Sequence, residues 1–460
     1  MDYSAANTGL WSFVIQLGLI AGAILLAQFL YRVVKPLRRA MLPVAVLAGF
    51  LLLAAKYLGV PLEDEMMEIL VFHGIALGFI AMSLRVPMQP RDSEEKLTGL
   101  RSGAVIVSTY LVQGAVGLLI SLALSRTLTP GLFHAAGMLL PMGYGQGPGQ
   151  ANNVGSAYEA LGFAGGRSYG MAIAAAGYLA ACTVGVVILN VLKSRGLLTP
   201  PAHSASPREQ ARDFFGAEGE SSASTSIDVL SIQAAMVIVV YLATFLVTRA
   251  LTGALDTFAP GAAATVSPLL WGFNFIIGSA LAIALRVLLG KRKTQRPSRA
   301  LQYQNNYLLG RISGFFFDVM IVAGIASIEL EDVRALWLPF LLMTVAGGAV
   351  TWLHLRLVCF SAYPDYRYQG LISMFGMLTG TISSGVLLLR EVDPELSTPA
   401  ANNLITGSSF GIILGAPILV LVSLAAKSEA MCLLTLGLVL AYLALLYFVI
   451  FRLGKKRKKE

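Results

Sequence analysis

The sequence predicts an all-α polytopic membrane protein with two inverted-topology repeats of five transmembrane helices each, a re-entrant hairpin in each repeat, and one extra C-terminal helix. Three observations lead to this prediction. Hydrophobic residues make up 56% of the 460-residue chain and charged residues only 13%, which is typical of multi-span helical membrane proteins. Apolar runs of membrane-spanning length alternate with short basic segments. Two glycine-rich polar stretches, 140–153 and 376–385, interrupt this pattern about half a chain apart.

The first repeat, residues 1–192, is expected to begin outside the cell. Its first apolar run, 9–34, is followed but not preceded by basic residues, so we expect a retained span and not a cleaved signal peptide. A hairpin is expected at 130–166. The other spans of this repeat are expected at 43–58, 66–84, 102–124 and 168–192.

A segment rich in Pro, Ser and charge, residues 193–226, is predicted to be a flexible cytoplasmic linker. The second repeat, residues 227–426, therefore starts inside and has the opposite orientation. Residues 427–460 are predicted to add one transmembrane helix with a basic cytoplasmic tail. The spans of the second repeat are expected at 227–251, 266–289, 303–328, 336–359 and 403–426, and its hairpin at 370–402.

The distribution of basic residues supports this topology. Most of the 34 Lys and Arg residues fall in predicted cytoplasmic segments, as expected for a multi-pass protein of the cell (inner) membrane with its N-terminus outside and its C-terminus in the cytoplasm. The net charge of +9 is therefore a topology signal, and we expect no nucleic-acid partner. The six basic residues in predicted outer segments are Lys56, Arg126, Arg167, Arg249, Arg334 and Lys427.

The two hairpins are the candidate binding elements. Each has about 33 to 37 residues, too few for two crossings of about 20 residues and a turn, so each should enter the membrane and return. Broken helices in inverted repeats are typical of secondary transporters, and helix N-termini there attract anions. Glycines let backbone approach a ligand, and amides and hydroxyls offer polar groups. The candidate substrate-binding residues are Gly145, Gln146, Gly147, Gln150, Asn152, Asn153, Thr379, Thr381, Ser383 and Ser384.

The first hairpin also carries a resemblance. The block Gly143-Tyr144-Gly145-Gln146-Gly147-Pro148-Gly149-Gln150-Ala151, followed by Tyr158-Glu159-Ala160-Leu161-Gly162-Phe163, resembles the first re-entrant loop of the glutamate:sodium symporter (ESS) family. The block that ends in Asn402 and Asn403 resembles its partner loop. The commoner Gly-Gly-His-Gly-Thr-Gly form of the family is replaced here by residues 142–147, and the extra helix is not part of the basic ten-span plan. The resemblance implies Na⁺-coupled uptake of glutamate by a homodimer whose hairpins move with a transport domain.

Na⁺ is the expected coupling ion, because hydroxyls, amides and carbonyls are common in the hairpins and titratable groups at depth are few. Asp318 lies near the middle of a span, where a carboxylate is costly and usually functional. Both cation coupling and a buried polar contact fit Asp318, and with proton coupling it would carry the proton. The candidate sodium ligands are Thr379, Gly380, Asn402, Asn403 and Asp318. No cofactor is expected.

The sequence leaves alternatives for both the substrate and the class of protein. Another carboxylate, such as citrate, or another amino acid fits the same hairpin geometry, and coupling to H⁺ is the alternative to Na⁺. An ion channel is the weaker alternative, because Gly143-Tyr144-Gly145 matches a K⁺-channel filter over three residues only and has no counterpart in the second half. We expect no enzyme, since the sequence has no HExxH motif and its four histidines are scattered.

Single polar or thiol groups inside spans are expected to pack or to bridge helices, not to bind substrate. Glu159 and Arg390 are expected near opposite membrane faces, where Arg390 could also pair with a carboxylate. The single groups within spans are His73, Gln113, Gln233, Asn274, Cys182, Cys359 and Cys432.

Overall fold

The computed structural model describes residues 3–4, 6–40, 42–86, 93–197, 227–272, 274–293, 305–393 and 398–455. Within these ranges the regular structure is helical and includes no strand, so the all-α prediction is confirmed. The predicted linker lies outside the described residues from 198 onward, as do the last residues of the basic tail, 456–460.

Nine helices of the described part of the chain are long and apolar enough to cross a membrane, which makes the chain a multi-pass membrane protein. The inverted relation of the two sequence halves stays a prediction. These nine helices are α1 (Thr8–Val33), α4 (Asp64–Leu84), α5 (Ser93–Arg126), α7 (Gly166–Ser194), α8 (Ile227–Phe258), α12 (Asn306–Ala326), α14 (Trp337–Ala362), α17 (Ala400–Ala425) and α18 (Glu429–Lys455).

The predicted spans coincide with single helices except at 266–289. There the structure describes α9 (Pro260–Gly272) and α10 (Asn274–Lys293), and residue 273 between them lies outside the described residues, so the prediction of one span stays a prediction. The span predicted at 43–58 is α3 (Val44–Tyr57), whose 14 residues are fewer than a full crossing requires. Short helices α2 (Lys35–Ala40) and α13 (Leu330–Ala335) were not predicted.

The chain folds into two compact units, and each unit draws on both halves of the sequence. Unit 1 consists of Met1–Gln16, Leu62–Met88 and Pro207–Ala323. Unit 2 consists of Leu17–Pro61, Gln89–Ser206 and Gly324–Glu460, and it contains both predicted hairpins.

Unit 1 is built around α4, α8 and α10, which pack on one another. Their core includes Ile80 of α4, Val237 of α8 and Ala282 of α10, all nearly inaccessible to solvent. α12 joins α4 through a hydrogen bond from Ser313 Oγ to the carbonyl of Gly78, 2.9 Å long. The hydroxyl thus satisfies its donor within the apolar bundle.

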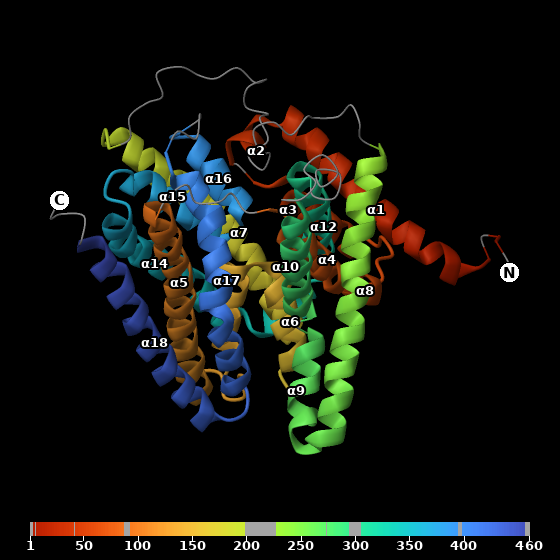
Figure 1. Cartoon of the computed structure of the whole chain (residues 1–460). Coiled ribbons are helices and arrows are strands. Elements are labelled where there is room, and N and C mark those ends of the chain that lie inside the picture. Colours follow the sequence, from red (N-terminus) through yellow and green to blue (C-terminus); the bar gives the residue numbers. More distant parts are fainter. Residues whose placement is uncertain are drawn as a thin grey trace. The chain divides into compact units, whose positions relative to one another are not determined.

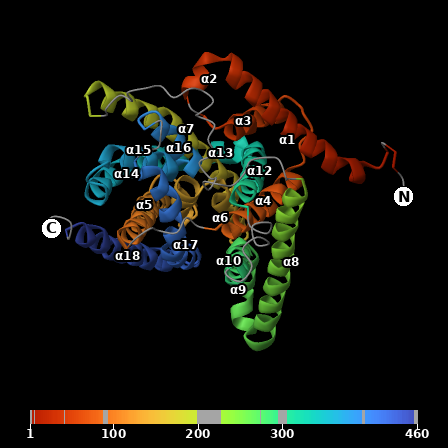
Figure 2. The same ribbon diagram turned by 45° about the horizontal axis from the view of Figure 1, so that its top comes forward.

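Unit 2 is built around α5, which packs against α14, α17 and α18. α5, drawn in orange, lies beside the blue helices α17 and α18 in both ribbon views (Figure 1, Figure 2). The extra C-terminal helix α18 is therefore part of the packed unit. The three cysteines of the chain are buried and form no disulfide, as expected for packing residues.

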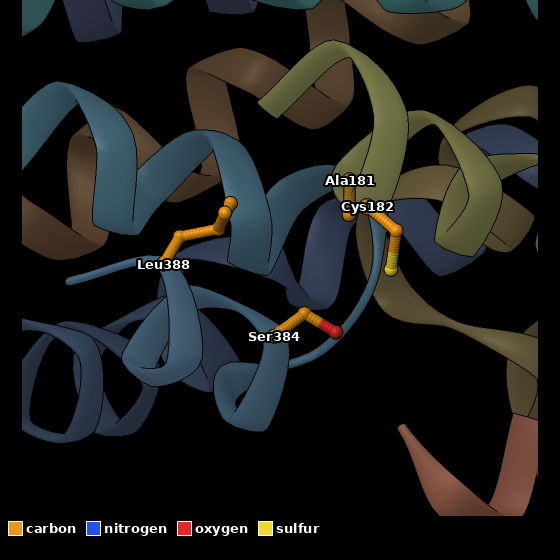
Figure 3. A pocket seen from close by; sticks show the side chains of 4 residues that line it. All are labelled: Ala181, Cys182, Ser384 and Leu388. Carbon is orange, nitrogen blue, oxygen red and sulfur yellow. The ribbon is translucent and has the colours of Figure 1, made fainter. Parts of the chain in front are cut away.

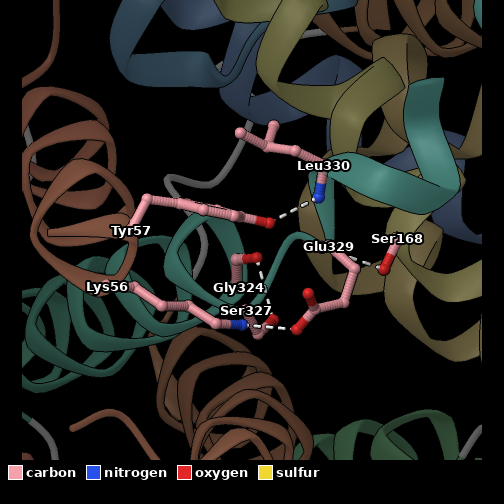
Figure 4. Close-up of polar contacts among 7 residues, drawn as sticks. All are labelled: Lys56, Tyr57, Ser168, Gly324, Ser327, Glu329 and Leu330. Carbon is pink, nitrogen blue, oxygen red and sulfur yellow. Dashed lines mark hydrogen bonds and ion pairs between the residues drawn. The ribbon is translucent and has the colours of Figure 1, made fainter. Parts of the chain in front are cut away.

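A polar cluster joins α3 and α7 to the segment before α13 (Figure 4). Lys56 Nζ lies 2.5 Å from Glu329 Oε1, and the backbone N–H of Glu329 donates to Ser168 Oγ over 3.2 Å. The backbone N–H of Leu330 donates to Tyr57 Oη over 2.8 Å. Two otherwise orphaned backbone donors at the start of α13 are thus satisfied by side chains of α3 and α7.

Glycines allow α5 to approach the first hairpin at backbone distance. A methyl group at Gly117 would lie against the backbone of Gly137, including 3.1 Å from its Cα atom. At Gly348 in α14, by contrast, a methyl group would meet no atom within 4 Å.

We expect Gly117→Ala to lower the free energy of unfolding by about 1–3 kcal/mol, because the added methyl overpacks a backbone contact. The matched variant Gly348→Ala should gain up to about 1 kcal/mol from helix propensity. Thermal unfolding of the detergent-purified proteins measures both. A Gly117→Ala protein as stable as Gly348→Ala would contradict the close contact.

Candidate functional site

The first hairpin is irregular until its second limb. A 3₁₀ turn, η1 (Ala136–Met138), leads to a π-helical turn, η2 (Pro141–Gln146), and then to α6 (Pro148–Glu159). Gly147 separates the last two with φ of 93°, a left-handed conformation that favours glycine. Pro148 opens α6, where its fixed φ suits a first helical residue and its missing N–H costs nothing. π-helical turns occur frequently at functional sites.

The second hairpin consists of two regular helices, α15 (Arg367–Thr379) and α16 (Ile382–Arg390). Gly380 and the extended residue Thr381 connect them. The two helices pack closely at glycines, since a methyl group at Gly376 would lie 2.9 Å from the Cα atom of Gly385. Both sequence-predicted interruptions are therefore real breaks between helical segments.

The tips of the two hairpins meet beside α7 within unit 2. A methyl group at Gly177 of α7 would collide with the carbonyl of Thr379 and lie 3.1 Å from the ring of Tyr144. A methyl group at Gly147 would lie 4.0 Å from the carbonyl of Gly380. Tyr144 Oη donates to the carbonyl of Thr344 over 2.8 Å and so fixes η2 to α14. The structure thus brings together the tips that the sequence predicted to form one site.

Both helices that start at these tips begin without a side-chain cap. The N-cap of α6 is Gly147, which has no side chain, and the N-cap of α16 is Thr381, whose side chain makes no capping hydrogen bond. The first N–H groups of a helix have no acceptor in their own helix and carry the positive end of its dipole. Two such ends in one buried place are suited to an anionic group.

Four buried polar atoms around the tips have no hydrogen-bond partner in the protein. Their side chains belong to residues that are at most 5% exposed. A buried polar atom without a partner costs about 1–3 kcal/mol, so such atoms call for a functional explanation. The atoms are Gln113 Oε1, Gln150 Oε1, Asn152 Oδ1 and Ser384 Oγ.

Ser384 borders a small hollow with Ala181, Cys182 and Leu388 (Figure 3). The hydroxyl of Ser384 and the thiol of Cys182 come from α16 and α7, on opposite sides of this hollow. The hollow is too narrow for a water molecule. The hydroxyl of Ser384 therefore has no water molecule beside it in this hollow.

The other predicted substrate-binding residues lie at the tips but differ in their surroundings. Thr379 is buried and its Oγ1 donates to the carbonyl of Phe375 over 2.8 Å, so its hydroxyl proton is already used. Gln146 and Thr381 are half-buried, and Asn153 is buried in α6. The side chain of Ser383 lies outside what the structure describes, although its backbone belongs to α16.

The predicted sodium ligands are not all brought together. Thr379 and Gly380 lie at the tip of the second hairpin, whereas Asn402 and Asn403 lie in the first turn of α17. Asn403 Nδ2 donates over 2.7 Å to Tyr366, the N-cap at the opposite end of α15 from Thr379. That helix separates the two ends by about 20 Å. Asp318 belongs to unit 1, where its side chain is exposed on that unit.

Glu159 and Arg390 lie at the ends of α6 and α16 away from the tips. The carboxylate of Glu159 accepts a hydrogen bond from the backbone N–H of Arg167 over 3.0 Å, which fixes the connection to α7.

Comparison with known proteins adds no identification. No model of a known protein family matches the chain, and no curated protein matches it significantly.

The sequence predicted a packing role for Gln113 of α5, but the structure places this residue at the hairpin tips. It is 0% exposed, and its Nε2 donates to the carbonyl of Leu378, next to Thr379. A methyl group at Gly145 would lie 2.7 Å from Gln113 Oε1. The available signal was a lone amide in the middle of an apolar run, which is costly in a membrane and therefore informative.

If the unpaired atoms serve a ligand, removing one of them should stabilise the protein without ligand. We expect Ser384→Ala to raise the free energy of unfolding by about 1–3 kcal/mol, the cost of one unpaired buried group. Ser373→Ala, in the same hairpin, should lower it by about 0.5–1.5 kcal/mol, because Ser373 Oγ donates to the carbonyl of Gly370 over 3.1 Å. Thermal unfolding of both variants measures the difference. Equal losses of stability would show that Ser384 is an ordinary packing residue.

Proposed function

We propose that the chain is a secondary active transporter that carries glutamate, or a related carboxylate, together with Na⁺ by alternating access. The substrate binds between the tips of the two hairpins. The observation that carries this proposal is the meeting of two uncapped helix N-termini, those of α6 and α16, in a buried place with unpaired polar atoms.

A carboxylate fits this arrangement because each helix end supplies N–H donors and a positive dipole end. The first amide donors of α6 are those of Gly149 and Gln150, since Pro148 has no N–H. Ser384 adds a buried hydroxyl in the first turn of α16. Neither N-cap makes a side-chain hydrogen bond, so a ligand oxygen is the natural acceptor for these donors.

Na⁺ as the coupling ion is supported by the oxygen-rich composition of the tips. Amide oxygens, a hydroxyl and the carbonyls around Gly380 are hard ligands of the kind that a small cation prefers. Proton coupling is the alternative, with Asp318 as the carrier.

The remaining parts of the proposal follow from the resemblance and the charge pattern. We place the protein in the cell (inner) membrane, with the N-terminus outside and the C-terminus in the cytoplasm, and expect a homodimer. Unit 2 holds both hairpins together with α5 and α7, as expected if the hairpins move with one transport domain. An ion channel stays the weaker alternative, because the three-residue match to a K⁺-channel filter has no counterpart in the second half of the sequence.

We expect purified protein in proteoliposomes to accumulate L-glutamate against its gradient when an inward Na⁺ gradient is imposed. D-glutamate, aspartate, glutamine and citrate serve as competitors. Gln150→Glu should raise the KM for glutamate at least about tenfold, which corresponds to about 1.4 kcal/mol, because it adds a like charge at the α6 N-terminus. Gln150→Leu, which adds no charge, is the matched control.

Several outcomes would revise this function in distinct ways. Uptake that ignores Na⁺ and follows a pH gradient would move the coupling to H⁺. Uptake of another compound but not glutamate would replace the substrate and keep the transporter. Ohmic current without uphill uptake would replace the transporter by a channel.

A further inference from the structure

We propose that Gln113 Oε1 is the acceptor for the positively charged group of the ligand, either the ammonium group of an amino acid or the coupling cation. This inference rests on the proposed function and deepens it, because it assigns opposite charges to two parts of the same site. The helix ends of α6 and α16 receive the carboxylate, and Gln113 of α5 receives the positive group.

The orientation of the Gln113 amide follows from its neighbours. Its Nε2 donates to Thr351 Oγ1 and to the carbonyl of Leu378, both over 2.9 Å. Thr351 has already given its hydroxyl proton to the carbonyl of Gly347 over 2.6 Å, so both neighbours act only as acceptors. A flipped amide would place Oε1 against two acceptor oxygens. The chemistry of the network therefore fixes which end of the amide is the oxygen.

The oxygen that remains has no partner in the protein. Gln113 is fully buried, and its Oε1 lies beside Gly145, where a methyl group would come within 2.7 Å of it. A carboxamide oxygen is only an acceptor. A carboxylate therefore gains nothing from it, whereas an ammonium group or a small cation does. The rest of the Gln113 side chain is committed to joining α5, α14 and α15, so the oxygen cannot turn away to find another donor.

The position of this oxygen favours a ligand role over a purely structural one. Leu378 directly precedes Thr379 in the second hairpin, and Gly145 lies in η2 of the first. Gln113 thus contacts both hairpins near their tips while its acceptor stays unused. If Gln113 served only to bridge helices, its two Nε2 hydrogen bonds would be sufficient for that role. Loss of Oε1 would then leave the affinity for the ligand unchanged.

The experiment compares Gln113→Leu, which removes the acceptor, with Thr351→Val, which removes one of the same bridging hydrogen bonds but keeps Oε1. For each purified full-length protein we would measure the KM of uptake for L-glutamate, for Na⁺, and for glutarate, which is glutamate without its ammonium group. Ligand-induced shifts of the thermal unfolding midpoint measure binding independently of transport. Where Gln113→Leu does not fold, Gln113→Met, with its unbranched side chain, takes its place.

Gln113→Leu should weaken binding at least tenfold, and Thr351→Val no more than about twofold. A loss confined to L-glutamate, with glutarate and Na⁺ unchanged, identifies the ammonium group as the partner. An equal loss for both substrates with a raised KM for Na⁺ identifies the cation.

Equal effects of the two variants on all three ligands would overturn the inference and leave Gln113 a structural bridge. Failure of the proposed function is a separate result, since it appears as absence of uptake by the wild-type protein. Ligand-induced stabilisation that Gln113→Leu abolishes would then still support the acceptor role.

Discussion

The architecture of unit 2 depends on one constraint: the backbone N–H groups at the start of a helix need hydrogen-bond acceptors. They have no acceptor in their own helix, and a membrane interior offers no water to replace one. Unit 2 places two such starts, those of α6 and α16, at the adjacent tips of its two hairpins without a side-chain cap. Glycines bring the surrounding backbones close together, since a methyl group at Gly177 would collide with the carbonyl of Thr379 and one at Gly147 would lie 4.0 Å from the carbonyl of Gly380. The long helices α5, α7 and α14 then serve as walls around this place.

The polar groups of the same unit divide into satisfied and unsatisfied sets. On the face that α14 turns to α5, His354 contacts Ser108 at 3.1 Å and Tyr447 of α18 at 2.8 Å, so a buried imidazole has both ring nitrogens paired. About one helical turn away, Thr351 binds Gln113, whose oxygen is left over. A buried polar atom without a partner lowers stability, so the unpaired atoms at the tips are retained at a cost. Such local violations are expected where function requires them.

Hydropathy and glycine content were sufficient to predict most helices and both interruptions, because membrane length and backbone satisfaction leave few alternatives. They could not predict what depends on side-chain direction. The lone amide of Gln113 has the same appearance in the sequence as that of Gln233, which accepts a hydrogen bond from the backbone of Asn305 in unit 1. Asn402 and Asn403 follow the second hairpin directly in the chain, and this proximity led to their prediction as sodium ligands. In the structure the length of α15 separates Asn403 from Thr379, which the sequence does not reveal. The assignment of Asp318 to the other unit likewise required three-dimensional contacts.

A site that excludes water strengthens every electrostatic contact within it, but it must open to admit a ligand. The contacts that close this site differ in what opening would break. α15 is tied to α5 by the Gln113–Leu378 hydrogen bond, and η2 is tied to α14 by the Tyr144–Thr344 hydrogen bond. α16, in contrast, packs on α15 through the glycine backbone contact of Gly376 with Gly385. Separating this contact costs dispersion contacts, and the ion pair between Lys193 of α7 and Glu391 after α16, 3.5 Å long, is a polar contact that opening would also break. Opening at α16 would therefore expose the helix ends while the Gln113 acceptor keeps its orientation.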